Sequence, residues 1–264
     1  MSVIQALILG IIQGLTEFLP VSSSGHIEIG KVLLGVQTTD NLAFSVLVHF
    51  ATVLSTIVVF RKDLWGLIKG FFEFKWNEET QFIAKIVVSM IPVGIVGLLF
   101  KDELETLFEG KIIFVGAMLL FTAAILFLSS LVKVHDKKVN FPRALIIGLA
   151  QTIAILPGIS RSGSTIGVAL LLGVDKQRAT RFSFLMVLLP ILGATALEAK
   201  DLFDAPDPGS IGAAPLVAGF LAAFVAGMVA CTWMITIVRR GKISWFGYYC
   251  AFVGIIAILG GLFL

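Results

Sequence analysis

Charged residues are scarce in this sequence, and their scarcity excludes most classes of soluble protein. Only 14% of the 264 residues are charged, 58% are hydrophobic, and the mean hydropathy is +1.00. Soluble domains carry about 25% charged residues, so this composition indicates a polytopic membrane protein whose main surroundings are the lipid bilayer. The net charge of +3 comes from loops, and no basic tract is interleaved with aromatic residues. We therefore expect no nucleic-acid partner.

Cysteine is also nearly absent. The two cysteines, Cys231 and Cys250, lie in late apolar segments without CxxC spacing. This pattern indicates neither a disulfide framework nor a cysteine metal cluster. The first apolar run begins at Val3 without a basic segment before it, which argues against a removable signal peptide.

Long apolar runs, in contrast, are abundant. A spanning helix needs about 17 to 25 residues, and six runs reach that length: 42–60, 82–100, 112–132, 182–198, 213–238 and 245–264. Two more apolar regions, 3–35 and 144–174, are each broken near the middle by a proline and a Ser/Gly cluster. Their arms of about 14 residues, or about 20 Å, are too short to cross comfortably.

The positions of Lys and Arg predict the orientation of the loops. Fourteen of the 20 Lys and Arg residues lie in the connections 61–81, 133–143, 175–181 and 239–242. The positive-inside rule assigns these loops to the cytoplasm, and assigns the acidic connections 101–111 and 199–212 to the outside. The sides alternate correctly only if 144–174 leaves the cytoplasmic side and returns to it. We therefore predict an all-α polytopic membrane protein with six transmembrane helices and two re-entrant helix-turn-helix hairpins, 3–35 and 144–174.

The two hairpins resemble each other in sequence. Gly10, Gln13 and the Ser22-x-Ser24-Gly25 cluster correspond to Gly148, Gln151 and Ser160-x-Ser162-Gly163 at an offset of 138 residues. Each half has one hairpin and three spans, so the halves have opposite orientation. We predict a single membrane domain, 1–264, built from inverted repeats at 1–132 and 144–264. Such repeats place a polar site near the middle of the membrane.

The segment 156–165 of the second hairpin, Leu-Pro-Gly-Ile-Ser-Arg-Ser-Gly-Ser-Thr, has the composition of a phosphate site. Glycines let the backbone approach a ligand, and hydroxyl groups and a guanidinium donate hydrogen bonds to phosphate oxygens. The predicted phosphate-binding residues are Gly158, Ser160, Arg161, Ser162, Gly163, Ser164 and Thr165. The apolar residues that follow favour a helix, so we expect the segment at a helix N-terminus, where unpaired N–H groups favour an anion.

Three cations lie inside apolar regions: Lys31, Lys85 and Arg161. Lys31 and Lys85 are near the ends of their segments, where a lysine extends to the interface. Arg161 lies at a hairpin tip and cannot reach the interface in this way. Insertion of an uncompensated arginine at the bilayer centre costs at least about 2.5 to 3.5 kcal/mol. We interpret Arg161 as a ligand for an anion; the alternative is that it neutralises Glu17.

The first hairpin supplies the matching chemistry. Gln13 and Glu17 are four residues apart and lie on one helix face. Glu17 would repel a diphosphate unless a divalent cation or Arg161 lies between them, so we expect a divalent cation, Mg²⁺ or Ca²⁺, at Glu17 and Gln13. Ser23 and His26, three residues apart, are consistent with a nucleophile and its base; a buried, hydrogen-bonded histidine is the alternative. Ser22 and Ser24 fit a turn as well as a site.

Other residues fit structural roles better. We expect His49 to pack with a hydrogen bond and Glu28 to pair with Lys31. Gly and Ala residues in 213–230 favour close helix packing or a homodimer face.

Two segments carry a family resemblance. Gln-Gly-Leu-Thr-Glu-Phe-Leu-Pro-Val-Ser-Ser-Ser-Gly-His at 13–26 and Pro-Gly-Ile-Ser-Arg-Ser-Gly-Ser-Thr at 157–165 resemble the signature segments of the bacterial undecaprenyl-diphosphate phosphatases, also called bacitracin resistance proteins. The similarity extends to Phe-Arg-Lys-Asp-Leu at 60–64, Phe-Ser-Phe-Leu at 182–185 and Gly-Ala-Thr-Ala-Leu at 193–197.

The resemblance implies a multi-pass enzyme of the bacterial cytoplasmic membrane that hydrolyses undecaprenyl diphosphate to the monophosphate carrier lipid of peptidoglycan synthesis. It also implies bacitracin tolerance, six spans with two re-entrant hairpins, and a site open to the outer side. By position, the family's acidic motif falls on Gln13 and Glu17, its serines on Ser22 and Ser23, and its histidine on His26. Its phosphate-binding residues fall on Ser160, Arg161, Ser162 and Thr165. The first acidic position, Glu in some members and Gln in others, is Gln13 here, so Glu17 carries more of the metal binding.

An alternative class is a transporter. Inverted repeats with broken helices are typical of secondary carriers, and a lipid-phosphate flippase needs the same anion site. Phosphate release distinguishes the two classes, because a carrier does no chemistry.

Overall fold

The computed structural model describes residues 1–36, 42–100, 112–132, 136–204 and 211–263. Within these ranges the secondary structure consists of helices, with only one isolated β-bridge between Lys137 and Val174. The predicted all-α class is therefore confirmed. The predicted outer connection 101–111 lies outside the described residues.

In the described part of the chain, four helices are long and apolar enough to cross a membrane: α5 (Glu78–Leu99), α7 (Ile112–Leu131), α12 (Ala213–Arg239) and α13 (Ser244–Phe263). A fifth candidate is α3 (Leu42–Val59), which meets α4 (Arg61–Phe71) at a bend of 76°. These five helices correspond to five of the six predicted spans. The chain is thus a multi-pass helical protein with four to five apolar helices of spanning length.

The remaining predicted span, 182–198, is not one helix. α10 (Lys176–Met186) ends and α11 (Leu188–Asp204) begins on either side of Val187. Pro190 explains this break, because proline has no N–H to donate and its ring clashes with the carbonyl four residues earlier, which here belongs to Met186. Apolar content alone does not reveal the break.

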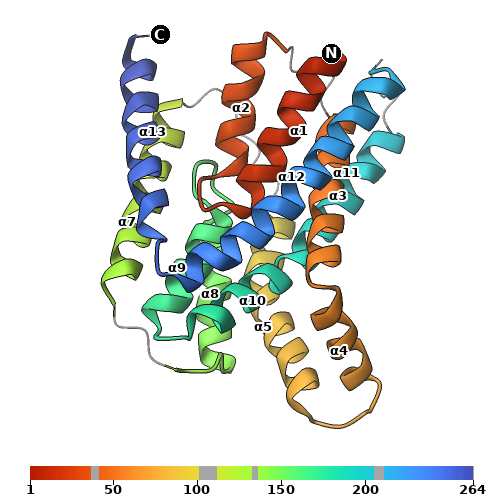
Figure 1. Ribbon diagram of the computed structural model, residues 1–264, viewed down its shortest axis with the longest axis vertical. Helices are drawn as coiled ribbons and strands as arrows, with labels where there is room; N and C mark the ends of the chain where they lie inside the picture. Colours follow the sequence, from red (N-terminus) through yellow and green to blue (C-terminus); the bar gives the residue numbers. More distant parts are fainter. Residues whose placement is uncertain (37–41, 101–111, 133–135, 205–210, 264) are drawn as a thin grey trace. The chain divides into compact units, whose positions relative to one another are not determined.

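Both predicted hairpins form pairs of helices joined by short turns. α1 (Val3–Phe18) contacts α2 (Ser23–Leu34), and α8 (Phe141–Ile153) contacts α9 (Arg161–Leu171). Figure 1 shows α1 and α2 side by side. Ser2 begins α1 with a capping box, and Asn140 begins α8 by accepting the Arg143 N–H at 3.0 Å. The helix-turn-helix form is confirmed, whereas re-entry into the membrane stays a prediction.

The chain divides into two compact units. The first unit comprises Met1–Leu19, Ser23–Val59 and Val187–Met234. Its helices approach closely at small residues: a Cβ added at Gly14 of α1 would lie 2.5 Å from the carbonyl oxygen of Ala223 in α12. Ser55 of α3 donates its hydroxyl to the carbonyl of Phe224 at 2.8 Å. Small residues of α12 therefore serve close helix packing inside this unit, and a homodimer stays a prediction.

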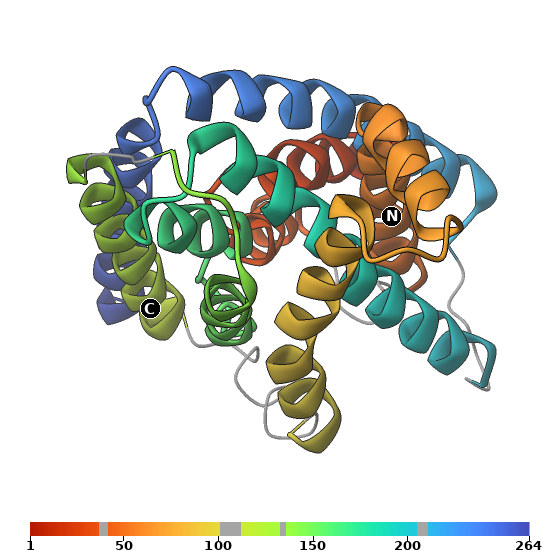
Figure 2. The ribbon, with the colours of Figure 1, turned by 90° about the horizontal axis from the view of Figure 1, so that it is seen from below.

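The second unit comprises Pro20–Ser22, Phe60–Met186 and Ile235–Leu264. Within it α7 and α13 lie side by side, as both views show (Figure 1, Figure 2). Their closest approach is reciprocal: a Cβ at Gly116 would lie 2.7 Å from the Gly254 carbonyl oxygen, and a Cβ at Gly254 would lie 2.8 Å from that of Gly116. Positions 116 and 254 differ by 138, the offset between the two hairpins. The division into inverted halves stays a prediction.

Candidate functional site

The carboxylate of Glu17 is the centre of a hydrogen-bonded group in the first unit. Glu17 is 9% exposed, and one helical turn before it Gln13 is 1% exposed. The Gln13 Nε2 amide donates to Glu17 Oε2 at 3.0 Å, and the Ser23 hydroxyl at the start of α2 donates to the same oxygen at 2.9 Å. Three predicted site residues from two helices are thus brought together.

The Ser23 hydroxyl faces a carboxylate instead of an imidazole. The sequence pairs Ser23 with His26, but among the described residues the hydrogen-bond partner of Ser23 is Glu17. His26 lies in α2, partly buried, and Ser24 is exposed. A serine hydroxyl that donates to a buried carboxylate is oriented for attack, with a base ready to accept its proton. The role of His26 as the base for Ser23 stays a prediction.

Glu17 and Gln13 have the chemistry of a hard-cation site. The Gln13 Oε1 atom is buried and has no hydrogen-bond partner among the described residues. A carboxylate and an amide oxygen suit Mg²⁺ or Ca²⁺. Groups of three or more His, Cys, Asp or Glu side chains that could hold a metal are absent from the described part of the chain. Mg²⁺ is usually held by one or two carboxylates together with substrate phosphates and water, and a divalent cation at this position stays a prediction.

The tip of the first hairpin, Pro20–Ser22, belongs to the second unit and packs against the second hairpin. A Cβ added at Gly163 in α9 would lie 3.1 Å from the Cβ of Pro20. The Cys250 thiol of α13 donates to the Pro20 carbonyl at 3.3 Å. Ser22 is 3% exposed and has a φ of 70°, a left-handed conformation that is uncommon outside glycine and that clusters at functional sites. The polar tips of the two signature segments are therefore neighbours within this unit.

The predicted phosphate segment forms the N-terminus of α9, as expected. Ser160 is the N-cap residue and accepts the Gly163 N–H at 3.1 Å. The Ser160 and Ser162 hydroxyl oxygens are 3.3 Å apart. Arg161 is the first residue of the helix and is partly buried. The positive end of the helix dipole and the adjacent guanidinium favour an anion at this position.

The hydroxyl groups of this segment have different roles. Thr165 donates its hydroxyl to the Arg161 carbonyl at 2.9 Å, a bond within the helix. Ser164 is 2% exposed, and its hydroxyl has no hydrogen-bond partner among the described residues. Gly158 has a φ of 94° and forms the turn before the helix. The Ser160 and Thr165 hydroxyls thus form hydrogen bonds within the first turns of α9, whereas the buried Ser164 hydroxyl is available to a ligand.

Thr122 of α7 supports this segment and was not identified from the sequence. Its hydroxyl oxygen accepts the Ser160 N–H at 3.0 Å and donates to the Gly158 carbonyl at 3.3 Å. Thr122 is fully buried. A hydroxyl in the middle of a predicted span was the available signal, but the sequence did not show which element it supports.

Two further expectations concern residues outside these groups. Lys31 and Glu28 form an ion pair at 2.7 Å, which confirms the predicted pairing. His49 Nδ1 lies 2.9 Å from the Ser45 carbonyl oxygen in the same helix, in agreement with the structural role expected for it.

Comparisons with known proteins cover nearly the whole chain. The family model described as bacitracin resistance protein BacA matches residues 6–256. Among similar proteins, one from Christiangramia forsetii is 55% identical over 98% of each chain, and one from Bacteroides thetaiotaomicron is 52% identical over 98% of this chain and 99% of its own. One from Halothermothrix orenii is 41% identical over the full length of both. All three are named undecaprenyl-diphosphatase. This chain therefore belongs to the bacitracin resistance protein family.

Proposed function

We propose that this protein is a membrane phosphatase that hydrolyses undecaprenyl diphosphate to undecaprenyl phosphate and inorganic phosphate. The observation that carries the proposal is the hydrogen bond from the Ser23 hydroxyl to the buried Glu17 carboxylate at 2.9 Å. It provides a nucleophile and a base in contact, inside a family whose members are named for this activity.

The proposed reaction begins with attack by the Ser23 oxygen on the terminal phosphorus. The bond between this phosphorus and the bridging oxygen breaks, undecaprenyl phosphate leaves, and the Ser23 proton moves to Glu17. Water then attacks the phosphoserine, Ser23 recovers a proton, and inorganic phosphate is released. A variant of this route, in which Glu17 or His26 activates water directly, gives the same products.

Charge on the phosphates is compensated by the second hairpin. We propose that Arg161, the first-turn N–H groups of α9 and the hydroxyls of Ser160, Ser162 and Ser164 bind the diphosphate. Within the second unit, Pro20 of the first signature segment packs against Gly163 of the second. A divalent cation, Mg²⁺ or Ca²⁺, would be held by Glu17 and Gln13 and would neutralise phosphate charge. Ser22 and Thr165 would shape the turns that carry these groups.

The proposed setting is the bacterial cytoplasmic membrane, with six spans, two re-entrant hairpins and a site open to the outer side. The reciprocal contact between Gly116 and Gly254 supports an inverted repeat. In this setting the reaction recycles the carrier lipid for peptidoglycan synthesis and confers bacitracin tolerance. The prenyl tail would lie in lipid or between helices.

A lipid-phosphate flippase is the second candidate, because broken helices in two related halves are typical of carriers. The separation of α10 from α11 at Val187 adds another broken helix that favours this candidate. Both activities are compatible with one anion site.

Phosphate release from a polyprenyl diphosphate by the purified protein tests the proposal. We expect release by the wild type and by Ser24→Ala, a matched control on an exposed neighbour, and loss of about 100-fold or more in Ser23→Ala. Retention of turnover by Ser23→Ala with loss in Glu17→Gln would select the direct water route. Folded wild-type protein that releases no phosphate would contradict the phosphatase and favour the flippase.

A further inference from the structure

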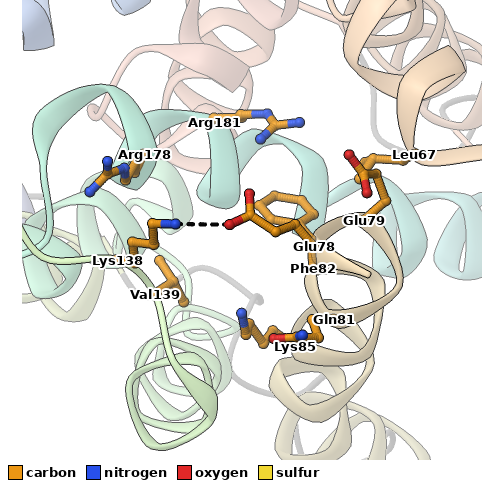
Figure 3. A pocket seen from close by; sticks show the side chains of 10 residues that line it. All are labelled: Leu67, Glu78, Glu79, Gln81, Phe82, Lys85, Lys138, Val139, Arg178 and Arg181. Atoms are coloured by element: carbon orange, nitrogen blue, oxygen red, sulfur yellow. Dashed lines mark hydrogen bonds and ion pairs between the residues drawn. The ribbon is translucent and has the colours of Figure 1, made fainter. Parts of the chain in front are cut away.

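A second polar pocket in the second unit contains none of the residues proposed for catalysis. Its volume is about 290 Å³. The side chains that line it are Leu67, Glu78, Glu79, Gln81, Phe82, Lys85, Lys138, Val139, Arg178 and Arg181 (Figure 3). They come from α4, α5, α10 and the segment before α8. The connections 61–81, 133–143 and 175–181, which the charge count assigns to the cytoplasmic side, thus meet at one place.

Cationic groups outnumber acidic groups in the lining, four to two. Three of the four form ion pairs: Lys138 with Glu78 at 2.9 Å, Arg178 with Asp136 at 2.9 Å, and Arg181 with Asp63 at 2.6 Å. The first pair is highly exposed, with 69% and 84% of the two side chains accessible. Exposed ion pairs contribute little to stability, so Lys138 can exchange its carboxylate for another anion at small cost.

Lys85 is the one lining cation that forms no ion pair among the described residues, although its charge also attracts the nearby Glu78 carboxylate. It is partly buried, and its ammonium lies 5.7 Å from the centre of the Phe141 ring. Figure 3 shows Lys85 and Lys138 on the pocket wall, and Glu79 beside Leu67 on the side away from Lys138. The Lys85 ammonium, and the Lys138 ammonium that can exchange its carboxylate for another anion, together form a place for an anion in this pocket.

Aromatic side chains surround the same region. Trp76 stacks on Phe141, the ring that faces Lys85, with ring centres 6.5 Å apart. Trp76 is 65% exposed, and Phe72 and Phe74 in the same loop are 64% and 85% exposed. Exposed aromatic rings next to lysine and arginine are typical of the headgroup level of a bilayer.

We propose that this pocket binds the phosphate of an anionic phospholipid headgroup at the cytoplasmic surface. Lys85 supplies the central charge, and Lys138 and Arg178 donate further hydrogen bonds to the phosphate oxygens. The acyl chains leave past the exposed rings of Phe72, Phe74 and Trp76 in the loop between α4 and α5. Phosphatidylglycerol, which carries one net negative charge, is the probe that fits this chemistry. The proposal is independent of the catalytic site, because it uses other residues.

The test measures retention of phosphatidylglycerol and phosphatidylcholine by the full-length protein after exchange into detergent containing a defined amount of each lipid. Lys85→Gln is compared with Lys62→Gln, a matched control that removes an exposed lysine of α4 outside the pocket lining. We expect wild-type protein and Lys62→Gln to prefer phosphatidylglycerol, and Lys85→Gln to bind it about tenfold more weakly, as expected for loss of a charge-assisted hydrogen bond. Thermal unfolding verifies that the variants are folded, and Arg178→Gln provides a second pocket variant.

Three results would overturn the proposal. Equal weakening in Lys85→Gln and Lys62→Gln would show attraction by general surface charge. Equal retention of both lipids by wild type, Lys85→Gln and Arg178→Gln would show that the pocket binds no headgroup. A thermal shift with inorganic phosphate that is lost in Lys85→Gln, without preference between the lipids, would assign the pocket to free phosphate.

Discussion

Replacement of Gly158 by alanine tests the geometry of the second hairpin most directly. Gly158 has a φ of 94°, in a region that residues with a side chain rarely adopt. A Cβ at this position would lie 2.5 Å from the Val115 carbonyl oxygen and 2.9 Å from the Met118 Cβ. Both atoms belong to α7: the first is a backbone atom, and the second is attached directly to the backbone. Relief of either clash therefore requires a shift of the helix.

The expected cost has two parts. A left-handed conformation costs a residue with a Cβ about 1 to 2 kcal/mol, and overpacking in a well-packed interior costs about 1 to 3 kcal/mol. The free energy of unfolding should therefore fall by about 2 to 5 kcal/mol. For a chain of this size about 2 to 4 °C is lost per kcal/mol, so the thermal midpoint should fall by about 4 to 20 °C.

The same substitution should reduce activity beyond its effect on folding. The Gly158 carbonyl is linked through Thr122 to the Ser160 N–H, so a shift of the turn moves the N-terminus of α9 and Arg161. We expect the folded fraction to bind the substrate diphosphate more weakly. This effect should appear as a raised KM for phosphate release at a temperature well below the midpoint.

Gly97→Ala is the matched control. A Cβ at Gly97, in α5 of the same unit, would meet no atom within 4 Å, and alanine is the better helix former by about 0.5 to 1 kcal/mol. We expect a midpoint equal to or above that of the wild type. If Gly158→Ala matched Gly97→Ala in both midpoint and KM, the proposed conformation of the turn would be refuted.

Three further predictions concern a buried hydrogen bond, the Glu17 carboxylate and the cation. Thr122→Val removes the acceptor of a buried N–H and should lower the free energy of unfolding by about 1 to 3 kcal/mol, whereas Thr122→Ser should restore most of it; equal thermal midpoints for the two variants would contradict this. Glu17→Gln keeps an oxygen for Ser23 but removes the charge, so phosphate release should fall by about 100-fold or more with a nearly unchanged midpoint. EDTA should stop wild-type release and Mg²⁺ should restore it, and release that continues in EDTA would argue against the cation at Glu17 and Gln13.

Much of the fold was predictable because it depends on local properties of the chain. The length of an apolar run decides whether it can span, and a Pro and Ser/Gly cluster ends a helix, so five apolar helices and both helix pairs were found from the sequence. The run 182–198 was misread as one helix because its hydropathy is continuous. The local signal was Pro190, whose effect on the Met186 carbonyl depends on backbone geometry and not on hydropathy.

The two signature segments were also evident from the sequence, but the partners of their side chains were not. Spacing along the chain placed Ser23 next to His26, whereas the turn before α2 brings its hydroxyl to Glu17. Thr122 gave no signal beyond a hydroxyl in an apolar span, because a local bond to the Met118 carbonyl accounts for that hydroxyl and its other two partners are 36 and 38 residues away in the chain. Those contacts depend on how α7 packs against the second hairpin.

The sequence by itself determined that this is a helical membrane protein of a recognisable family, with an acidic motif in one hairpin and a phosphate motif in the other. Those features follow from residue type and order, which the chain carries whatever its fold. Only the tertiary structure decided that the Ser23 hydroxyl donates to Glu17 and that Thr122 accepts the Ser160 N–H. It also decided that residues of three basic connections line one pocket together with Lys85. Hydrogen bonds and charge clusters require distances of a few ångströms, and only the packing of the helices brings distant parts of the chain that close.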